Sequence, residues 1–358
     1  MSFNQNDISH TDNIADTLKV FLRKRSGNKT AIITDSNCHK LCLPIIKKVL
    51  PENTGVFILN PGENYKTVKS VIEIWDFFTE NNIERDSLII NLGGGIVTDT
   101  GGFAASTFKR GVPFINIPTS LLAQTDASAG GKTGINFKGL KNEIGTFTLP
   151  EQVFISDIFL KTLPDDEFLS GFGEMLKHAL IFDKSHYKEL ILFIKKDFPE
   201  KNYKNLQYLI RKSVNIKIHF VKNDFKEKGL RKTLNFGHTF GHALESLYAQ
   251  KKHSLKHGVC IAYGIICELM LSVKHLGFDK KSFYEISKDI FDIYGKINIR
   301  EKDFEKIYEY MRHDKKNKNE KIRCVLLRDA ENPEINRIIS KTDIFESLRF
   351  FNELSSEM

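Results

Sequence analysis

Short apolar runs alternate with helical patterns from the N-terminus to residue 163. Five runs have the length and composition of buried strands, and most end in a polar or glycine-rich turn. They are Ala31–Asp35, Gly55–Asn60, Ser87–Leu92, Val112–Ile117 and Val153–Ser156. Because strands that alternate with helices form parallel sheets covered by helices, residues 1–163 are predicted to be a Rossmann-like α/β domain. Ligands of such sheets bind beyond the carboxyl ends of the strands.

The pattern changes at Pro164, where the proline is followed by three acidic residues that mark a helix start. Long helical patterns follow, and two strand-like runs come late, at Ile322–Leu327 and Asn336–Ser340. We therefore predict a mostly α-helical C-terminal domain over residues 164–358. No internal repeat is visible.

Composition narrows the class of protein. With 41% hydrophobic and 27% charged residues, the chain is expected to fold as a globular protein. The net charge of +8 suits an anionic small molecule as well as nucleic acid. The basic run Asp314–Lys321 lacks interleaved aromatic residues, so no nucleic-acid partner is expected.

Three further observations predict a cytoplasmic protein without a membrane partner. The longest apolar stretch, Gly258–Ser272, contains Glu268 and is shorter than a membrane span. The five cysteines form no Cys-x-x-Cys pair, which favours a reducing compartment. The first ten residues lack the basic and apolar regions of a secretory signal.

Two segments have the composition of anion-binding sites. The run Gly93–Asp99 follows a predicted strand, and its glycines would let a phosphate approach the backbone at a helix start. Thr98 takes the place of the third glycine of G-x-G-x-x-G, so a tight turn without a ligand stays an alternative. The run Asp126–Asn142 holds Lys132 and Lys141 beside Gly, Ser and Asn residues; a solvated loop is its alternative.

A set of histidines and a carboxylate could hold a metal ion. Glu174 and His178 are spaced one helical turn apart, as are His238 and His242, and His257 follows. Imidazole and carboxylate ligands suit Zn²⁺, and three of them would leave an open catalytic position. The spacing does not decide which three bind, and a structural role is the alternative for each.

The same segment carries groups that could bind an acidic substrate. Arg231 could hold a carboxylate or phosphate with two hydrogen bonds, and Asn235 lies between it and His238. Lys217 alone would be read as part of a solvated basic face.

Together, several long segments resemble the 3-dehydroquinate synthase family of sugar-phosphate cyclases. They follow one another in order over nearly the whole chain: Pro61–Lys66, Gly93–Gly111, Ile117–Asn136, Gly139–Phe147, Ser170–Ile181, Lys226–Glu245, Lys256–Val259 and Asp314–Lys318. The resemblance implies a phosphate-eliminating, carbocycle-forming enzyme, expected to be a phosphorus–oxygen lyase, of aromatic amino-acid biosynthesis, the shikimate pathway. Its reaction would convert 3-deoxy-D-arabino-heptulosonate 7-phosphate to 3-dehydroquinate and phosphate, with NAD oxidising the substrate transiently.

The resemblance also implies a role for individual residues, with NAD in the first domain and metal and substrate in the second. Zn²⁺ or Co²⁺ would be held by Glu174, His238 and His257, whereas His242 would face the substrate phosphate. The implied NAD contacts are Asp35, Asn37, Glu63, Lys66, Gly94, Gly95, Asp99, Thr119, Ser120, Lys132, Lys141, Phe159 and Thr162. The implied substrate contacts are Asp126, Lys132, Asn142, Lys177, Lys217, Arg231, Asn235, His242, Lys315 or Lys316, and Arg110 from the partner in a homodimer.

The chain departs from the family pattern at Thr98, Ser120, Phe225 and Val259-Cys260, none of which is an implied metal ligand. Three other functions are considered: another sugar-phosphate cyclase, a metal-dependent oxidoreductase like glycerol dehydrogenase, and a non-catalytic NAD- or metal-binding protein. A polyol dehydrogenase needs no phosphate-binding cluster. The set Lys132, Asn142, Asn235 and His242 therefore speaks against that function.

Overall fold

The computed structural model describes residues 7–25, 27–138, 140–249, 251, 254–313 and 321–358. It divides into two compact units, Met1–Phe168 and Leu169–Met358. The division falls inside helix α6 (Asp165–Phe182), which begins in the first unit and continues into the second. Each unit is described by itself.

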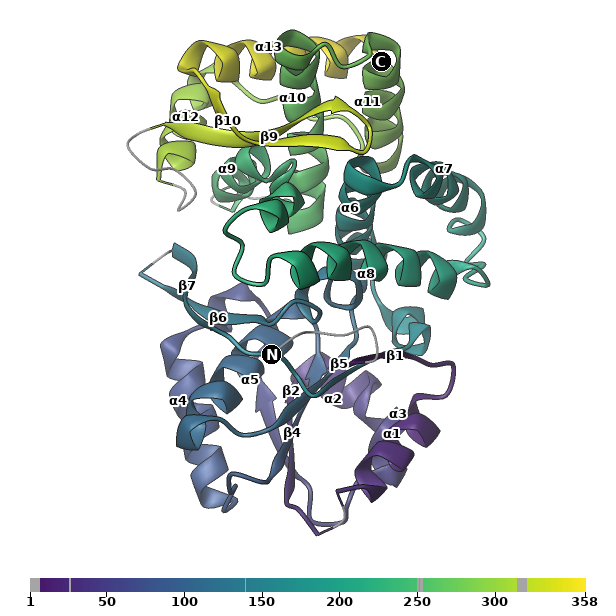
Figure 1. The fold of residues 1–358 in the computed structure, drawn as a ribbon, viewed down its shortest axis with the longest axis vertical. Helices are drawn as coiled ribbons and strands as arrows, with labels where there is room; N and C mark the ends of the chain where they lie inside the picture. The colour runs from purple at the N-terminus through teal and green to yellow at the C-terminus, as the bar shows by residue number, and fades with distance from the viewer. Residues whose placement is uncertain (1–6, 26, 139, 250, 252–253, 314–320) are drawn as a thin grey trace. The chain divides into compact units, whose positions relative to one another are not determined.

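The first unit is built on a sheet of six parallel strands in the order β1-β8-β5-β4-β2-β3 (Figure 1). Their bounds are β1 (Ile8–His10), β2 (Thr30–Asp35), β3 (Gly55–Leu59), β4 (Leu88–Gly93), β5 (Phe114–Pro118) and β8 (Gln152–Ile155). All five predicted strands are present, and the α/β fold class is confirmed. The short edge strand β1, which pairs with β8, was not predicted.

Helices cover both faces of this sheet, with α4 (Val68–Glu80) and α5 (Gly95–Thr107) on one face (Figure 1). Helices α1 (Ile14–Arg23) and α3 (Leu43–Ile46) cover the other. Neighbouring residues of a strand point to opposite faces, so Ile33 packs in the first core and Ile32 in the second. Apolar residues at nearly every position of the central strands therefore produce a sheet buried on both sides.

A hairpin outside the sheet is formed by most of the segment Asp126–Asn142, for which a solvated loop was the alternative. Residues Ala123–Ala127 form a π-helical turn, and β6 (Lys132–Phe137) then pairs antiparallel with β7 (Leu140–Phe147). The hairpin is fixed because Ile135 is buried in the core under α4 and α5. In addition, the Thr146 hydroxyl lies 2.7 Å from that of Thr133 and 2.8 Å from that of Ser106 on α5.

The second unit is mostly helical, as expected, and α10 (His257–Leu276) is its central helix. Helix α10 packs against α9 (His238–Tyr248), α11 (Lys280–Tyr294), α13 (Lys341–Glu357) and the hairpin of β9 (Ile322–Asp329) and β10 (Asn332–Ile339). The two strands predicted late in the chain are therefore confirmed. Further helices are α7 (Lys184–Leu192), α8 (Leu206–Asn223) and α12 (Phe304–Arg312).

Short elements complete the described chain. They are α2 (Ser36–Leu41), the 3₁₀ turns Lys47–Val49, Glu63–Tyr65, Phe108–Arg110, Asp157–Thr162, Leu230–Asn235 and Glu301–Asp303, and the π-helical turn Phe193–Asp197. None of the five cysteines, all of which are described, forms a disulfide. Helix α10 is long and apolar enough to cross a bilayer, but 67% of its apolar window is buried in the structure, as in a core helix.

Candidate active site

His238 is the first residue of α9, directly after Gly237, whose φ of 77° places it in the left-handed region. The ring Nδ1 lies 3.1 Å from the carbonyl oxygen of Phe236. Because a carbonyl oxygen only accepts hydrogen bonds, the proton of the neutral ring belongs on Nδ1. The Nε2 lone pair is then available to a ligand.

His257 is the first residue of α10 and is oriented in the same way. Its Nδ1 lies 3.2 Å from Oε2 of Glu245, which comes from α9. Its Nε2 lies 3.2 Å from Oε1 of Glu174 on α6. A histidine whose second nitrogen is held by a carboxylate is the usual arrangement of a metal-binding imidazole.

Glu174 joins the two histidines. Its Oε1 lies 3.5 Å from His238 Nε2 as well as 3.2 Å from His257 Nε2. Its other oxygen, Oε2, forms an ion pair with Lys177 Nζ at 2.5 Å, and both side chains are buried. The predicted metal ligands Glu174, His238 and His257 thus lie together, with the Nε2 atoms of both histidines near Oε1 of Glu174.

The electrostatics of this cluster favour a cation. Burial lowers the pKa of His257, but hydrogen bonds and negative charge from Glu174 and Glu245 outweigh it and raise the pKa to about 10. The carboxylates that stabilise a proton on the ring would also stabilise a divalent ion. Two imidazoles and a carboxylate fit Zn²⁺ or Co²⁺ and leave a position for substrate.

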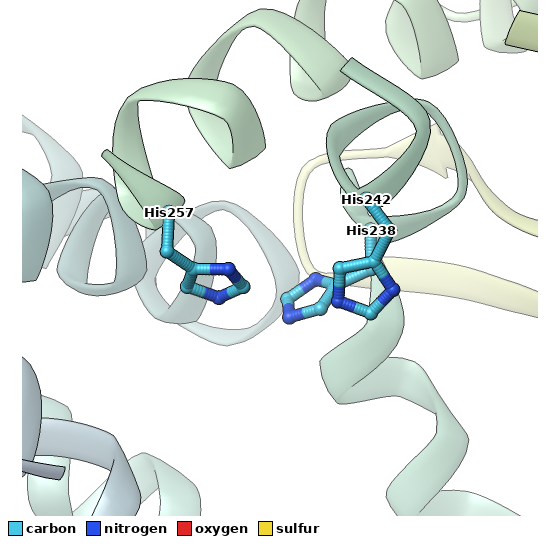
Figure 2. A group of neighbouring side chains, drawn as sticks. All are labelled: His238, His242 and His257. Atoms are coloured by element: carbon cyan, nitrogen blue, oxygen red, sulfur yellow. The ribbon is translucent and has the colours of Figure 1, made fainter. Parts of the chain in front are cut away.

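His242 lies beside this cluster, and Figure 2 shows its ring turned towards those of His238 and His257. The centroid of the His242 ring lies 5.2 Å from the centroid of the His238 ring and 5.8 Å from that of the His257 ring. One nitrogen of each ring lies within 4.8 Å of the others, so a three-histidine ligand set is also geometrically open. His178, which is spaced one helical turn after Glu174, is fully buried on α6.

The turn before α9 holds the groups expected to bind an acidic substrate. Asp224 accepts hydrogen bonds from the backbone amides of Lys228, Gly229 and Arg231 and so fixes this turn. The buried Arg231 guanidinium donates to the carbonyl oxygen of Phe225 at 2.7 Å. The departure at Phe225 therefore leaves the contact to Arg231 intact, because a backbone atom makes it.

Two other predicted residues belong to the same region of the chain. Asn235 donates from Nδ2 to Glu227 Oε1 at 2.7 Å. Lys217 is buried on α8. Like Lys177, it is a cationic side chain of the helical unit with little solvent contact, which strengthens its interaction with an anion.

In the first unit, the predicted NAD contacts lie at the carboxyl ends of the parallel strands. Gly94 and Gly95 follow β4 and begin α5, and Asp35 ends β2. Thr119 and Ser120 follow β5, and the Thr119 hydroxyl lies 3.2 Å from Cys38 Sγ. The Thr98 hydroxyl donates to the carbonyl oxygen of Gly95 on the same helix, so this departure leaves the glycine turn intact.

Lys66 links α5 to the hairpin of β6 and β7. Its buried ammonium donates to Asp99 Oδ2 at 2.6 Å and to Asn142 Oδ1 at 2.5 Å. Its carbonyl oxygen accepts from the amide of Asn136, which in turn donates from Nδ2 to Glu63. The structure thus places Asn142, expected at the substrate phosphate, among residues expected at NAD.

The remaining predicted residues are spread over the first unit. Asp126 is half-buried in the π-helical turn, Phe159 is buried, and the exposed ones are Asn37, Arg110, Lys132, Lys141 and Thr162. Lys315 and Lys316 lie outside the described residues. Three residues that support the site were not predicted from the sequence: Glu245, Asp224 and Glu227. For Glu245 a signal existed, because it lies two helical turns after His238 on the same face.

Comparisons with known proteins agree over both units. Residues 56–170 match the family model "3-dehydroquinate synthase N-terminal", and residues 171–317 match "3-dehydroquinate synthase C-terminal". A curated 3-dehydroquinate synthase of Parabacteroides distasonis is 42% identical over 337 residues, which cover 94% of this chain and 95% of the relative.

Two solved structures share the fold. The 2-epi-5-epi-valiolone synthase of Streptomyces hygroscopicus subsp. jinggangensis, with NAD⁺ and Zn²⁺ bound, has a TM-score of 0.85 at 21% identity, over 99% of this chain and 98% of that one. A 2-deoxy-scyllo-inosose synthase complexed with carbaglucose-6-phosphate, NAD⁺ and Co²⁺ has a TM-score of 0.81 at 23% identity, over 96% of each chain.

Proposed function

The chain belongs to the 3-dehydroquinate synthase family, and we propose that it converts 3-deoxy-D-arabino-heptulosonate 7-phosphate to 3-dehydroquinate and phosphate. The observation that carries the proposal is the convergence of Glu174 Oε1 on the Nε2 atoms of His238 and His257. Glu174, His238 and His257 would hold a Zn²⁺ or Co²⁺ ion. When bound, this ion would polarise a substrate hydroxyl and NAD would accept and return a hydride.

The chain's own residues would bind the substrate and compensate its charge. Arg231 and Lys217 are suited to its carboxylate, because both are buried cations. Lys177 and Asp126 would face the ring hydroxyls. The phosphate would be bound by Lys132, Asn142, Asn235, His242 and one of Lys315 and Lys316. Fixed cationic and amide groups of this kind lower the barrier by orienting the substrate and stabilising developing charge.

NAD would bind at the carboxyl ends of the strands of the first unit. The start of α5 at Gly94 and Gly95 offers backbone amides to a pyrophosphate. Asp35, Lys66 and Asp99 lie at the same sheet edge and would contact the rest of the nucleotide. NAD would act catalytically, because the hydride it accepts would be returned to the substrate within each turnover.

We also infer a cytoplasmic homodimer in which Arg110 reaches the phosphate of the partner's site. The absence of disulfides among the five cysteines supports a reducing compartment. Arg110 is exposed at the end of the turn after α5, which leaves its side chain accessible to a second chain.

The decisive experiment measures inorganic phosphate and NADH together, with substrate in large excess over NAD and enzyme. We expect many phosphates released per NAD and no net accumulation of NADH. Glucose 6-phosphate, which has no carboxylate for Arg231, serves as the alternative cyclase substrate, and glycerol as the oxidoreductase substrate.

Each alternative function has its own signature in this assay. Stoichiometric NADH from glycerol would establish an oxidoreductase instead. Faster phosphate release from glucose 6-phosphate would establish a different cyclase. Absence of turnover with every substrate, in protein that binds NAD, would leave a binding protein and contradict the proposal.

A further inference from the structure

The N-terminus of α9 is capped by a residue from another helix. Its N-cap residue is Gly237, which has no side chain to accept the hydrogen bonds of the first amides. Instead, Glu268 of α10 accepts from the Gly237 amide through Oε2 at 2.9 Å and from the Thr239 amide through Oε1 at 3.0 Å. The Glu268 side chain is fully buried.

The residue between these two amides is His238. The Glu268 carboxylate therefore fixes the backbone on both sides of a candidate metal ligand. The hydrogen bond of the His238 ring to the Phe236 carbonyl oxygen then sets the ring itself. A negative charge at this position also complements the helix dipole of α9.

The reach of Glu268 depends on a close approach of the two helices. A Cβ atom added at Gly264 of α10 would clash with the carbonyl oxygen of Gly237, so only glycine permits this approach. Glu268 lies one turn further along the same face of α10. Because α10 also begins with His257, a single helix carries one candidate ligand and holds the backbone of another.

We propose that Glu268 is a positioning residue of the metal site, which keeps His238 Nε2 in reach of Glu174 and His257. The proposal rests on the metal site proposed above and adds a residue that acts through the backbone on both sides of His238. Its chemistry requires a carboxylate, because both oxygens must accept. A glutamine could accept from one amide only, and its own NH₂ would face the other.

The test compares Glu268→Gln with the wild-type protein in direct metal binding. Zn²⁺ and Co²⁺ affinities are measured by competition with a chromophoric chelator, and the visible spectrum of the Co²⁺ form reports the ligand geometry. We expect affinity to fall roughly 10–100-fold, as for lost outer-shell partners of metal ligands. The Co²⁺ spectrum should change while the circular dichroism of the helices is retained.

The matched control removes a cap from a helix that carries no candidate ligand. Ser340 caps α13 by accepting from the Asp343 amide. Ser340→Ala should lower the melting temperature without changing metal affinity or the Co²⁺ spectrum. If it weakened metal binding as much as Glu268→Gln does, general destabilisation would be the cause and the proposal would be wrong.

Two more variants separate the possible failures. Glu174→Gln tests the metal site itself: if it leaves affinity unchanged, the proposed site is wrong and Glu268 loses its role with it. If Glu174→Gln weakens binding and Glu268→Gln does not, only the role of Glu268 is refuted. If Glu268→Gln does not fold, Glu268→Asp takes its place in the test. The aspartate keeps the negative charge but is one methylene shorter, so we expect it to weaken metal binding as well. Failure of both Glu268 variants to fold would make Glu268 a folding residue and overturn the proposal.

Discussion

At the scale of single residues, the two carboxylate oxygens of Glu174 have different partners. Oε1 faces His238 and His257, while Oε2 is paired with the buried ammonium of Lys177. The ion pair keeps the side chain from rotating away from the histidines. A buried carboxylate held in this way is prepared for a cation before the cation binds.

The two possible ligand sets differ by Glu174 and His242, which gives a direct prediction. Glu174→Gln should reduce Zn²⁺ affinity by more than the roughly 10–100-fold typical of an outer-shell loss. His242→Gln should leave affinity near the wild-type value and instead raise KM for the phosphate-bearing substrate. Equilibrium competition with a chelator measures the first effect and steady-state kinetics the second. The reverse ranking of affinities would identify the three-histidine set as the site.

A second prediction concerns His186 and acid stability. Burial lowers the pKa of His186 from its ordinary value of 6.5 to about 3. Between these values the unfolded chain binds a proton that the folded chain does not, so stability falls as the pH is lowered from 6.5 towards 3. The loss should be at most ~1.4 kcal/mol per pH unit. Urea unfolding at a series of pH values measures it.

The variant that tests this is His186→Gln, which keeps a group able to hydrogen-bond the Ser213 hydroxyl, 2.8 Å from His186 Nε2. Its unfolding free energy should depend less steeply on pH in the same window. Leu192→Gln provides the control, since the exposed Leu192 lies on the same helix α7 and its substitution by Gln removes no titratable group, so the slope should stay unchanged. Equal slopes for His186→Gln and wild type would refute the assignment.

At the scale of elements, the sequence predicts those strands whose position is determined by a local pattern of apolar residues. The central strands are continuous apolar runs bounded by turns, so their positions follow from the chain alone. Strand β1 has only three residues, and β7 is almost wholly exposed with charged residues along it, so neither has a recognisable period. Their pairing depends on partners elsewhere in the fold.

The same limit applies to the candidate site. The spacing of Glu174 and the histidines indicates a metal site but does not decide which of them are ligands. Only the family resemblance selects three of them. The contacts that hold the candidate ligands in place are even harder to predict from the sequence. Glu268 and Gly237 are far apart in sequence, and nothing in either segment indicates that a buried carboxylate replaces a cap. Such contacts follow from packing, which a single sequence does not reveal.

Lys66 gives a prediction for the hairpin. Lys66→Met should lower the free energy of unfolding by about 2 kcal/mol, because it leaves the Asp99 carboxylate without its ion pair. It should also weaken NAD binding and speed hydrogen exchange in β7, which Lys66 anchors through Asn142. Chemical denaturation, titration calorimetry and exchange mass spectrometry measure the three effects.

The control for this variant is Lys69→Met. Lys69 forms a distant and exposed pair with Glu73, at 3.9 Å, and such pairs contribute little. We expect no change in NAD affinity or β7 exchange. Unchanged exchange in Lys66→Met would mean that the hairpin is held by its other contacts, such as those of Thr146 with Thr133 and Ser106.

At the scale of the whole molecule, the turn after α5 carries the residue for which we propose a contact with a second chain, Arg110. Lys109, Arg110 and Gly111 have consecutive φ values of 47°, 68° and 116°. Non-glycine residues in this region cost of order 1–3 kcal/mol, and such strain concentrates at functional positions. The turn leaves Arg110 exposed at the surface of its unit.

Subunit mixing tests this role. Arg110→Ala chains and Lys132→Ala chains should each be nearly inactive as pure dimers. In a hybrid dimer, one site would combine an intact Lys132 with the partner's intact Arg110. Random pairing of equal amounts should therefore restore about a quarter of the wild-type activity. No recovery, with hybrid formation verified by native mass spectrometry, would place Arg110 in its own subunit's site or outside any site.

Helix α6 has a consequence for how such chains can recombine. It begins with Asp165, Asp166 and Glu167, whose charges favour a helix start, and it carries Glu174 further along. The compact units divide at Phe168, and the two family models meet at residues 170 and 171, both inside this helix. In a chimera of this chain and a relative that is joined at either point, the two halves of α6 would come from different parent proteins. A crossover that leaves this helix whole must therefore fall ahead of Asp165 or after Phe182, and not at the division between the units.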